Sequence, residues 1–338
     1  MKKLKGLWAG ALMFIIVCML AGCGLKSSAP ATGASSAGNR SYAVTDIQGT
    51  RVELPEKPQR ILTLSMSTDE VVLGLVPPDH LVAVNALLDD PVSSNITELA
   101  QQVPQRIKNP SVEEIAALQP DLVIMPDWGD VSRAQQLRDL GLKVVVCYGA
   151  KNLEQIKDTV TLIAAAVGEP ERGQALLEQM DDELAWVEER VQRIPSGQRR
   201  SVVLLSLMST YGGAGCSFDE ACRLAGVTNG MATAGIQTGQ AMTKEQLVQI
   251  DPDVLFLPTY NNHGQYDIEK FRAKYLDDPS LSSMKAIRNK SLVEPFEGYI
   301  YNCSQDFVFG VQEIAYRVYG DEFAQPTDRH LTAVPAGE

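Results

Sequence analysis

One stretch of the sequence occurs twice, and this repeat restricts the fold more than any other feature. Its copies are SVEEIAALQPDLVIMP at 111–126 and TKEQLVQIDPDVLFLP at 243–258, which keep a Glu, a Pro-Asp pair and the final Pro at matching positions. Two copies so far apart indicate two lobes of similar design rather than a solenoid of short repeats. Two lobes imply a cleft between them, and clefts between domains are where small ligands bind.

Each copy of the repeat predicts a short helix followed by a buried strand. Ser111 with Glu114, and Thr243 with Gln246, have the spacing of a capping box, in which two side chains satisfy free N–H groups at the start of a helix. A proline then ends each helix. The apolar run that follows, 122–125 in the first copy, is typical of a parallel strand that is buried on both faces.

The rest of the sequence continues this alternation of strands and helices, which is the pattern of parallel βαβ units. We therefore expect an α/β fold of two similar lobes, each a mainly parallel sheet flanked by helices. Residues 151–195 are amphipathic without a strand signal and predict a long, rigid connector helix with one interruption at 168–170. The expected organisation is a signal peptide at 1–22, a flexible tether at 23–40, an N-terminal lobe at 41–150, the connector at 151–195, a C-terminal lobe at 196–324 and a loose tail at 325–338.

The N-terminus has the pattern of an export signal. A basic start precedes an apolar run, Leu7–Leu20, that is shorter than the ~20 residues of a membrane span and is typical of a secretory signal. The tetrapeptide LAGC at 20–23 resembles a bacterial lipobox, which implies that Cys23 carries a lipid and becomes the mature N-terminus. Residues 24–39 are rich in Ala, Ser and Gly and predict a flexible tether. We expect an exported protein, lipid-anchored to the extracytoplasmic or periplasmic face of a membrane.

Charge and cysteine content restrict the function. The formal net charge is −12, which argues against nucleic-acid binding because that requires a basic face. The cysteines lack the spacing of zinc or iron–sulfur sites, and we predict no cofactor. Cys147, in an apolar run, predicts a buried thiol. Cys216 and Cys222 have two open readings, a disulfide of an exported protein or two free thiols.

Several candidate ligand-binding residues lie in loops at the carboxyl ends of the predicted strands, where open α/β sheets bind ligands. Aromatic rings with polar tips suit a large planar or ring-shaped chelate. His263 is a candidate ligand of haem iron, with Met66 or a tyrosine across the cleft, or simply a solvated loop residue. The candidates are Met66, Ser67, Trp128, Tyr211, Tyr260, His263, Tyr299 and Tyr301.

The sequence resembles a family, the lipoprotein substrate-binding components of ABC importers for iron–siderophores, haem and cobalamin. The likeness covers about 42–324 and depends on PQRIL at 58–62, the paired repeat, LGLKV at 140–144 and the helical connector. It implies a monomeric, non-enzymatic protein with small closure on ligand. The implied partners are an ABC permease dimer with its ATPase subunits, and the implied ligand is a metal chelate.

The family carries one acidic residue on each lobe that pairs with arginines of the permease. By motif these positions are Glu113 and Glu245, each in the first turn of a capped helix. The alternative is that both glutamates only complement the helix dipole, a contribution of about 0.3–1 kcal/mol.

Other functions fit less well. An importer lipoprotein for bare zinc or manganese ions needs about three or four converging His, Asp or Glu ligands, and the chain has only three His. An exported α/β hydrolase needs a nucleophile elbow, and a phosphate-binding enzyme needs a Gly-rich loop with its Lys, but neither motif is found.

The cleft loops are poor in Arg, which disfavours anionic siderophores, while 87–90 lacks the aromatics of cobalamin-binding members. Corrinoid, haem and siderophore all stay open.

Overall fold

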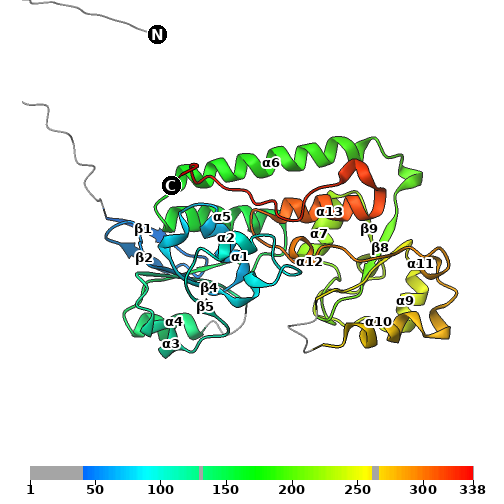
Figure 1. The fold of residues 1–338 in the computed structure, drawn as a ribbon, viewed down its shortest axis with the longest axis horizontal. Coiled ribbons are helices and arrows are strands. Elements are labelled where there is room, and N and C mark those ends of the chain that lie inside the picture. The colour runs from blue at the N-terminus through cyan, green and yellow to red at the C-terminus, as the bar shows by residue number, and fades with distance from the viewer. Residues whose placement is uncertain (1–40, 129–131, 261–265, 338) are drawn as a thin grey trace, which may run out of the picture. The chain divides into compact units, whose positions relative to one another are not determined.

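The computed structural model describes residues 41–128, 132–260 and 266–337, and Asn39–Glu338 forms one compact unit (Figure 1). The signal peptide, the tether, Cys23 and His263 lie outside the described residues, so the expectations for them stay predictions. None of the helices in the described residues combines the length and the apolar character that crossing a bilayer requires.

The first lobe contains a five-stranded sheet in which every neighbouring pair is parallel, in the order β5-β4-β3-β6-β7. An antiparallel hairpin precedes it. The strands are β1 (Tyr42–Thr45), β2 (Arg51–Leu54), β3 (Ile61–Thr63), β4 (Leu81–Asn85), β5 (Arg106–Ile107), β6 (Leu122–Pro126) and β7 (Val144–Cys147). The helices are α1 (Met66–Leu73), α2 (Thr97–Ala100), α3 (Val112–Ala117) and α4 (Ser132–Asp139), with 3₁₀ turns η1 (Pro78–His80) and η2 (Ala86–Asp89).

The second lobe contains a four-stranded parallel sheet in the order β11-β10-β8-β9. Its strands are β8 (Ser201–Leu204), β9 (Thr228–Asn229), β10 (Val254–Phe256) and β11 (Leu292–Val293). Its helices are α7 (Ser217–Leu224), α8 (Gly230–Thr233), α9 (Lys244–Ile250), α10 (Ile268–Leu276), α11 (Lys285–Arg288), α12 (Glu297–Ile300) and α13 (Phe307–Tyr319), with 3₁₀ turns η3 (Ser196–Gln198), η4 (Pro279–Leu281) and η5 (Asp321–Phe323). Two separate parallel sheets, each with flanking helices, confirm the predicted fold class.

The sequence repeat is also a structural repeat, formed by α3–β6 in one lobe and α9–β10 in the other. Both predicted capping boxes are present, at Ser111 and at Thr243. After each helix the chain turns through a left-handed residue, Gln119 with φ 50° and Asp251 with φ 44°. The two halves therefore match down to a strained backbone position.

Alternating side chains of the sheets point into different cores. On β6, Leu122 and Ile124 belong to a large cluster that also contains residues of the second lobe, whereas Val123 and Met125 belong to a core private to the first lobe. The strands β8 and β10 alternate in the same way, with Val203 and Leu255 in a core private to the second lobe. Each lobe thus has its own core on one face of its sheet and contributes the other face to a shared core.

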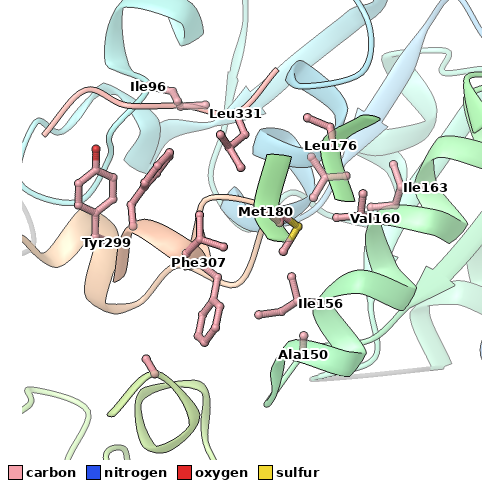
Figure 2. Close-up of a cluster of buried hydrophobic side chains, with 14 of the residues drawn as sticks. Ile96, Ala150, Ile156, Val160, Ile163, Leu176, Met180, Tyr299, Phe307 and Leu331 are labelled. Atoms are coloured by element: carbon pink, nitrogen blue, oxygen red, sulfur yellow. The ribbon is translucent and has the colours of Figure 1, made fainter. Parts of the chain in front are cut away.

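The predicted connector is formed by two helices, α5 (Leu153–Ala166) and α6 (Pro170–Gln192), which meet where the sequence predicted an interruption. The chain reverses because Gly168 adopts φ 75° and Pro170, without an N–H, begins a new helix. The helix α6 packs against both α5 and α13 (Figure 1). Figure 2 shows part of the shared core, where side chains of α5 and α6 lie beside Phe307 and Leu331.

The C-terminal tail is not loose, so that prediction is wrong. Leu331 is only 7% exposed in the shared core. Its backbone N–H donates to Asp306 Oδ1 at 2.8 Å, and the N–H of Ala333 donates to the carbonyl oxygen of Gly74, in the first lobe, at 2.8 Å. The tail composition concealed this packing because its polar residues outnumber the one leucine that anchors it.

Candidate functional site

Two adjoining cavities lie between the lobes, beside the carboxyl ends of the parallel strands. Their volumes are about 410 Å³ and 390 Å³, and both are lined by residues of both lobes. Met208 and Tyr301 line both cavities, which adjoin at these residues. These volumes fall in the range of small-molecule sites.

The larger cavity, called here the aromatic cavity, is rich in rings and hydroxyl groups. The first lobe and α5 supply Ser65, Ser67, Thr68, Trp128, Tyr148, Gly149, Lys151 and Thr159. The second lobe supplies Met208, Tyr211, Cys216, Ser217, Thr238, Tyr301 and Cys303. The cap of α1 explains the cluster of hydroxyls, since the Ser65 hydroxyl accepts from the backbone N–H of Thr68 at 3.2 Å and the helix begins there.

Tyr211 and Tyr301 form one wall of the aromatic cavity, with ring centroids 5.2 Å apart and planes inclined at 42°. The Tyr211 hydroxyl shares a hydrogen bond of 2.8 Å with Ser217, and the Tyr301 hydroxyl donates to Ser206 Oγ at 2.8 Å. Burial raises the pKa of both phenols, and the nearby Glu297 carboxylate raises that of Tyr301 further. Both phenols are therefore neutral near pH 7, and they offer ring faces and hydroxyl groups rather than charge.

Trp128 lines the same cavity from the first lobe. It is 61% exposed, the most exposed of the large hydrophobic side chains in the described residues. Its ring lies against Gly149, where a Cβ atom would stand 2.0 Å from Trp128 Cδ1. The backbone N–H of Gly149 donates to Asp127 Oδ1 at 2.6 Å, which fixes this approach. An exposed indole beside a cavity is a stacking surface for a ligand.

The smaller cavity, called here the Glu297 cavity, has a different character. It is lined by Met66, Leu87 and Ser93 of the first lobe and by Ser206, Leu207, Met208, Pro258, Tyr260, Tyr266, Glu297 and Tyr301 of the second. Glu297 is the only charged side chain among these described lining residues. In the aromatic cavity the corresponding single charged residue is Lys151.

The structure brings six of the predicted ligand-binding residues to the cavities. Ser67, Trp128 and Tyr211 line the aromatic cavity, Met66 and Tyr260 line the Glu297 cavity, and Tyr301 lines both. His263 lies outside the described residues.

The prediction that Tyr299 binds ligand is wrong, because this side chain is 1% exposed in the core. Its ring packs edge-on against Phe296, and its hydroxyl donates to the carbonyl oxygen of Pro326 at 3.0 Å. Tyr299 and Tyr301 are two residues apart on a helical turn, so they point to different sides.

Sequence reasoning missed Glu297 and Lys151. Lys151 follows β7 and Glu297 follows β11, each within a few residues, so an ionisable residue near the carboxyl end of a strand was the signal available. The missed hydroxyls, such as Ser217, have no comparable signal because serine is common in any loop.

The described cysteines are all free thiols, so Cys216 and Cys222 are not paired, and Cys147 is buried as predicted. Burial raises the pKa of the Cys303 thiol in the aromatic cavity to about 11. Within 41–128, 132–260 and 266–337, no cluster of three or more His, Cys, Asp or Glu side chains is arranged to hold a metal ion.

Glu113 and Glu245 lie at matching exposed positions in the first turns of α3 and α9. The pKa of each carboxyl is lowered, first by a hydrogen bond from its own backbone N–H and then by the capping hydroxyl, Ser111 or Thr243. Both lobes thus present a charged carboxylate to solvent at the same point of the repeat.

Comparison with known proteins gives consistent matches. A family profile described as periplasmic binding protein matches residues 61–294. The uncharacterized ABC transporter substrate-binding lipoprotein YvrC of Bacillus subtilis is 24% identical over 96% of this chain and 100% of that protein. The Fe(3+)-citrate-binding protein YfmC of the same species is 22% identical over 87% of this chain and 88% of that protein. The solved apo form of the periplasmic heme-binding protein RhuT from Roseiflexus sp. RS-1 has a TM-score of 0.66 and 23% identity, covering 79% of this chain and 99% of that chain.

Proposed function

Since the chain belongs to the periplasmic binding protein family, we propose that it is the solute-binding component of an ABC importer and captures a metal chelate between its lobes. The family consists of substrate-binding transport proteins, not enzymes. The observation that carries the proposal is the pair of inter-lobe cavities, one of which is lined by two paired tyrosines and an exposed tryptophan. An iron–siderophore, haem or a corrinoid fits this chemistry, because each presents a broad face with polar groups at its rim.

In this proposal, aromatic rings and hydroxyl groups of the aromatic cavity make different contacts with the chelate. Trp128 and the ring faces of Tyr211 and Tyr301 stack on the chelate, and the hydroxyls around Ser67 and Ser217 bond its rim. Because both phenols are neutral at pH 7, a bond from either one to iron would form with release of its proton. The shared core ties the lobes together, which supports capture with small closure rather than a wide hinge motion.

Delivery requires a permease with its ATPase subunits. Glu113 and Glu245 are the proposed docking residues, because a monomer that presents equivalent carboxylates on two similar lobes matches a permease dimer with paired arginines. Cys23 is the proposed lipid anchor, which holds the protein at the extracytoplasmic face of the membrane.

A thermal-shift screen with haem, cyanocobalamin, ferric citrate and ferrioxamine B tests the proposal. A chelate present at 100 times its dissociation constant stabilises the protein by about 2.7 kcal/mol. The double variant Tyr211→Ala plus Tyr301→Ala removes that shift, whereas Tyr316→Ala, on α13 outside both cavities, keeps it. Absence of a shift with every chelate contradicts the proposal.

A further inference from the structure

Glu297 is an almost buried acid whose two carboxylate oxygens have different surroundings. Its Oε1 accepts hydrogen bonds from the backbone N–H of Thr259, from the Thr259 hydroxyl at 3.1 Å and from the backbone N–H of Tyr260 at 3.0 Å. Its Oε2 has no partner among the described residues, although the residue is only 7% exposed and lines the cavity. Oε2 is itself accessible within the cavity, where a ligand can supply the donor that the described residues do not.

The surroundings of the Glu297 cavity are acidic. Asp90 and Glu297 both act on the Tyr260 phenol, whose pKa is raised first by burial and then by these two carboxylates. Arg272 lies next to the lining residue Pro258, but its guanidinium already donates to the carbonyl oxygen of Pro258 at 2.8 Å and pairs with Glu294 at 2.7 Å. No described lining residue of this cavity is basic.

The two adjoining cavities therefore carry charges of opposite sign. Lys151 is the charged residue of the aromatic cavity, and Glu297 is that of its neighbour. A ligand that spans both cavities meets an ammonium group at one end and an unpartnered carboxylate oxygen at the other.

From this arrangement we propose that Glu297 is a specificity-determining residue, whose free oxygen binds a cationic or amide N–H donor group on the captured chelate. This inference rests on the proposed function and narrows it. Chelates with an ammonium or amide arm are preferred over chelates whose polar groups are all carboxylates. Charge-assisted hydrogen bonds are about twice as strong as neutral ones, and a carboxylate-only rim is repelled by the same oxygen.

Glu297→Gln is the sharpest test, because the amide oxygen still accepts from Thr259 and Tyr260 while the free oxygen becomes an NH₂ donor. Dissociation constants are measured by tryptophan fluorescence for ferrioxamine B and cyanocobalamin, which carry ammonium or amide groups, and for haem and ferric citrate, whose rims are carboxylate. The wild-type protein prefers the first pair, and Glu297→Gln lowers that preference about tenfold or more. The matched control Glu178→Gln, exposed on α6 and outside both cavities, leaves the preference unchanged.

The outcomes separate this inference from the proposed function. If no chelate binds the wild-type protein, the proposed function fails and the inference with it. If chelates bind but the wild-type protein prefers carboxylate rims, or if Glu297→Gln changes all four affinities by the same factor, the inference alone is overturned. Should Glu297→Gln not fold, the order of the four wild-type affinities still decides.

Discussion

The carboxylate of Asp253 accepts hydrogen bonds from the backbone N–H of Ser201 at 2.9 Å and from its hydroxyl at 3.0 Å. Asp253 precedes β10 and Ser201 begins the neighbouring parallel strand β8, so this contact fixes the start of the strand pair. In the first lobe, Asp121 accepts in the same way from the backbone N–H groups of Gln59 and Arg60, at 2.8 Å and 3.0 Å. The repeated Pro-Asp pair therefore joins two strands in each lobe.

Removing this contact should destabilise either lobe. We expect Asp253→Ala, and separately Asp121→Ala, to lower the free energy of unfolding by about 1–3 kcal/mol, because strand N–H groups lose a charged acceptor. Urea unfolding measures the change. The exposed Asp277→Ala serves as control, with an expected effect within about 0.5 kcal/mol. Equal stabilities for all three variants would show that the motif is not a structural joint.

Features that depend on nearby residues were predictable from the sequence. The capping boxes at Ser111 and Thr243 were found because a cap needs only residues three apart. The prediction for Tyr299 failed because its side chain packs against Phe296 and hydrogen-bonds to Pro326 in the C-terminal tail. A contact with a segment so distant in the sequence cannot be predicted from the residues around Tyr299. The sequence predicted that loops at the carboxyl ends of the strands form the site. The role of Glu297 could be inferred only from the structure, which shows the hydrogen-bond partners of its carboxylate.

The packed tail gives a second prediction. Leu331→Ala should lower the free energy of unfolding by about 2–5 kcal/mol, because it opens a cavity where the tail meets α6 in the shared core (Figure 2). Thermal or urea unfolding measures the effect. Leu140→Ala, at a residue that is 57% exposed, should change stability by less than about 0.5 kcal/mol. If Leu331→Ala were as stable as Leu140→Ala, the tail would contribute nothing to stability, as the prediction of a loose tail requires.

Asp69 makes the stability depend on pH. This carboxyl accepts from the Thr63 hydroxyl and from the backbone N–H of Asn85 at 2.9 Å, yet burial raises its pKa to about 8. The unfolded chain releases this proton near pH 4, so between about pH 4 and pH 8 the folded protein holds a proton that the unfolded chain does not. Stability is fully present below that window and falls as the pH rises through it, by up to about 1.4 kcal/mol per pH unit.

Asp69→Asn should flatten this profile, because the amide oxygen still accepts from the backbone N–H of Asn85, the NH₂ group can donate to the Thr63 hydroxyl, and the amide cannot ionise. Urea unfolding at pH 5, 6, 7 and 8 measures the slope. Part of the slope remains, since burial and the nearby Asp306 also raise the pKa of Glu70. The exposed Asp79→Asn should leave the wild-type slope intact, and a wild-type slope in Asp69→Asn would show that Asp69 does not bind the proton.

Docking to the permease should depend on both repeat glutamates. The double variant Glu113→Ala plus Glu245→Ala should abolish chelate uptake in cells while binding the chelate as tightly as the wild-type protein, because both side chains are exposed and neither lines a cavity. Glu171→Ala removes an exposed first-turn glutamate from α6 instead and should leave uptake normal. Undiminished uptake by the double variant would contradict docking and would leave the alternative that both glutamates only complement the dipoles of their helices.

Gly149 should control the affinity of the aromatic cavity through Trp128. The Cβ atom of Gly149→Ala would overlap the Trp128 ring, which must then rotate, so chelate affinity should fall about tenfold, a loss typical of one aromatic contact. In a Trp186→Phe background, Trp128 is the only tryptophan after residue 22, and its quenching by the bound chelate reports the affinity directly. Gly197→Ala is the matched control, since nothing lies within 4 Å of its Cβ position. If Gly149→Ala binds as tightly as Gly197→Ala, or if the chelate does not quench Trp128, the indole is not a ligand contact and the chelate binds against the tyrosine wall alone.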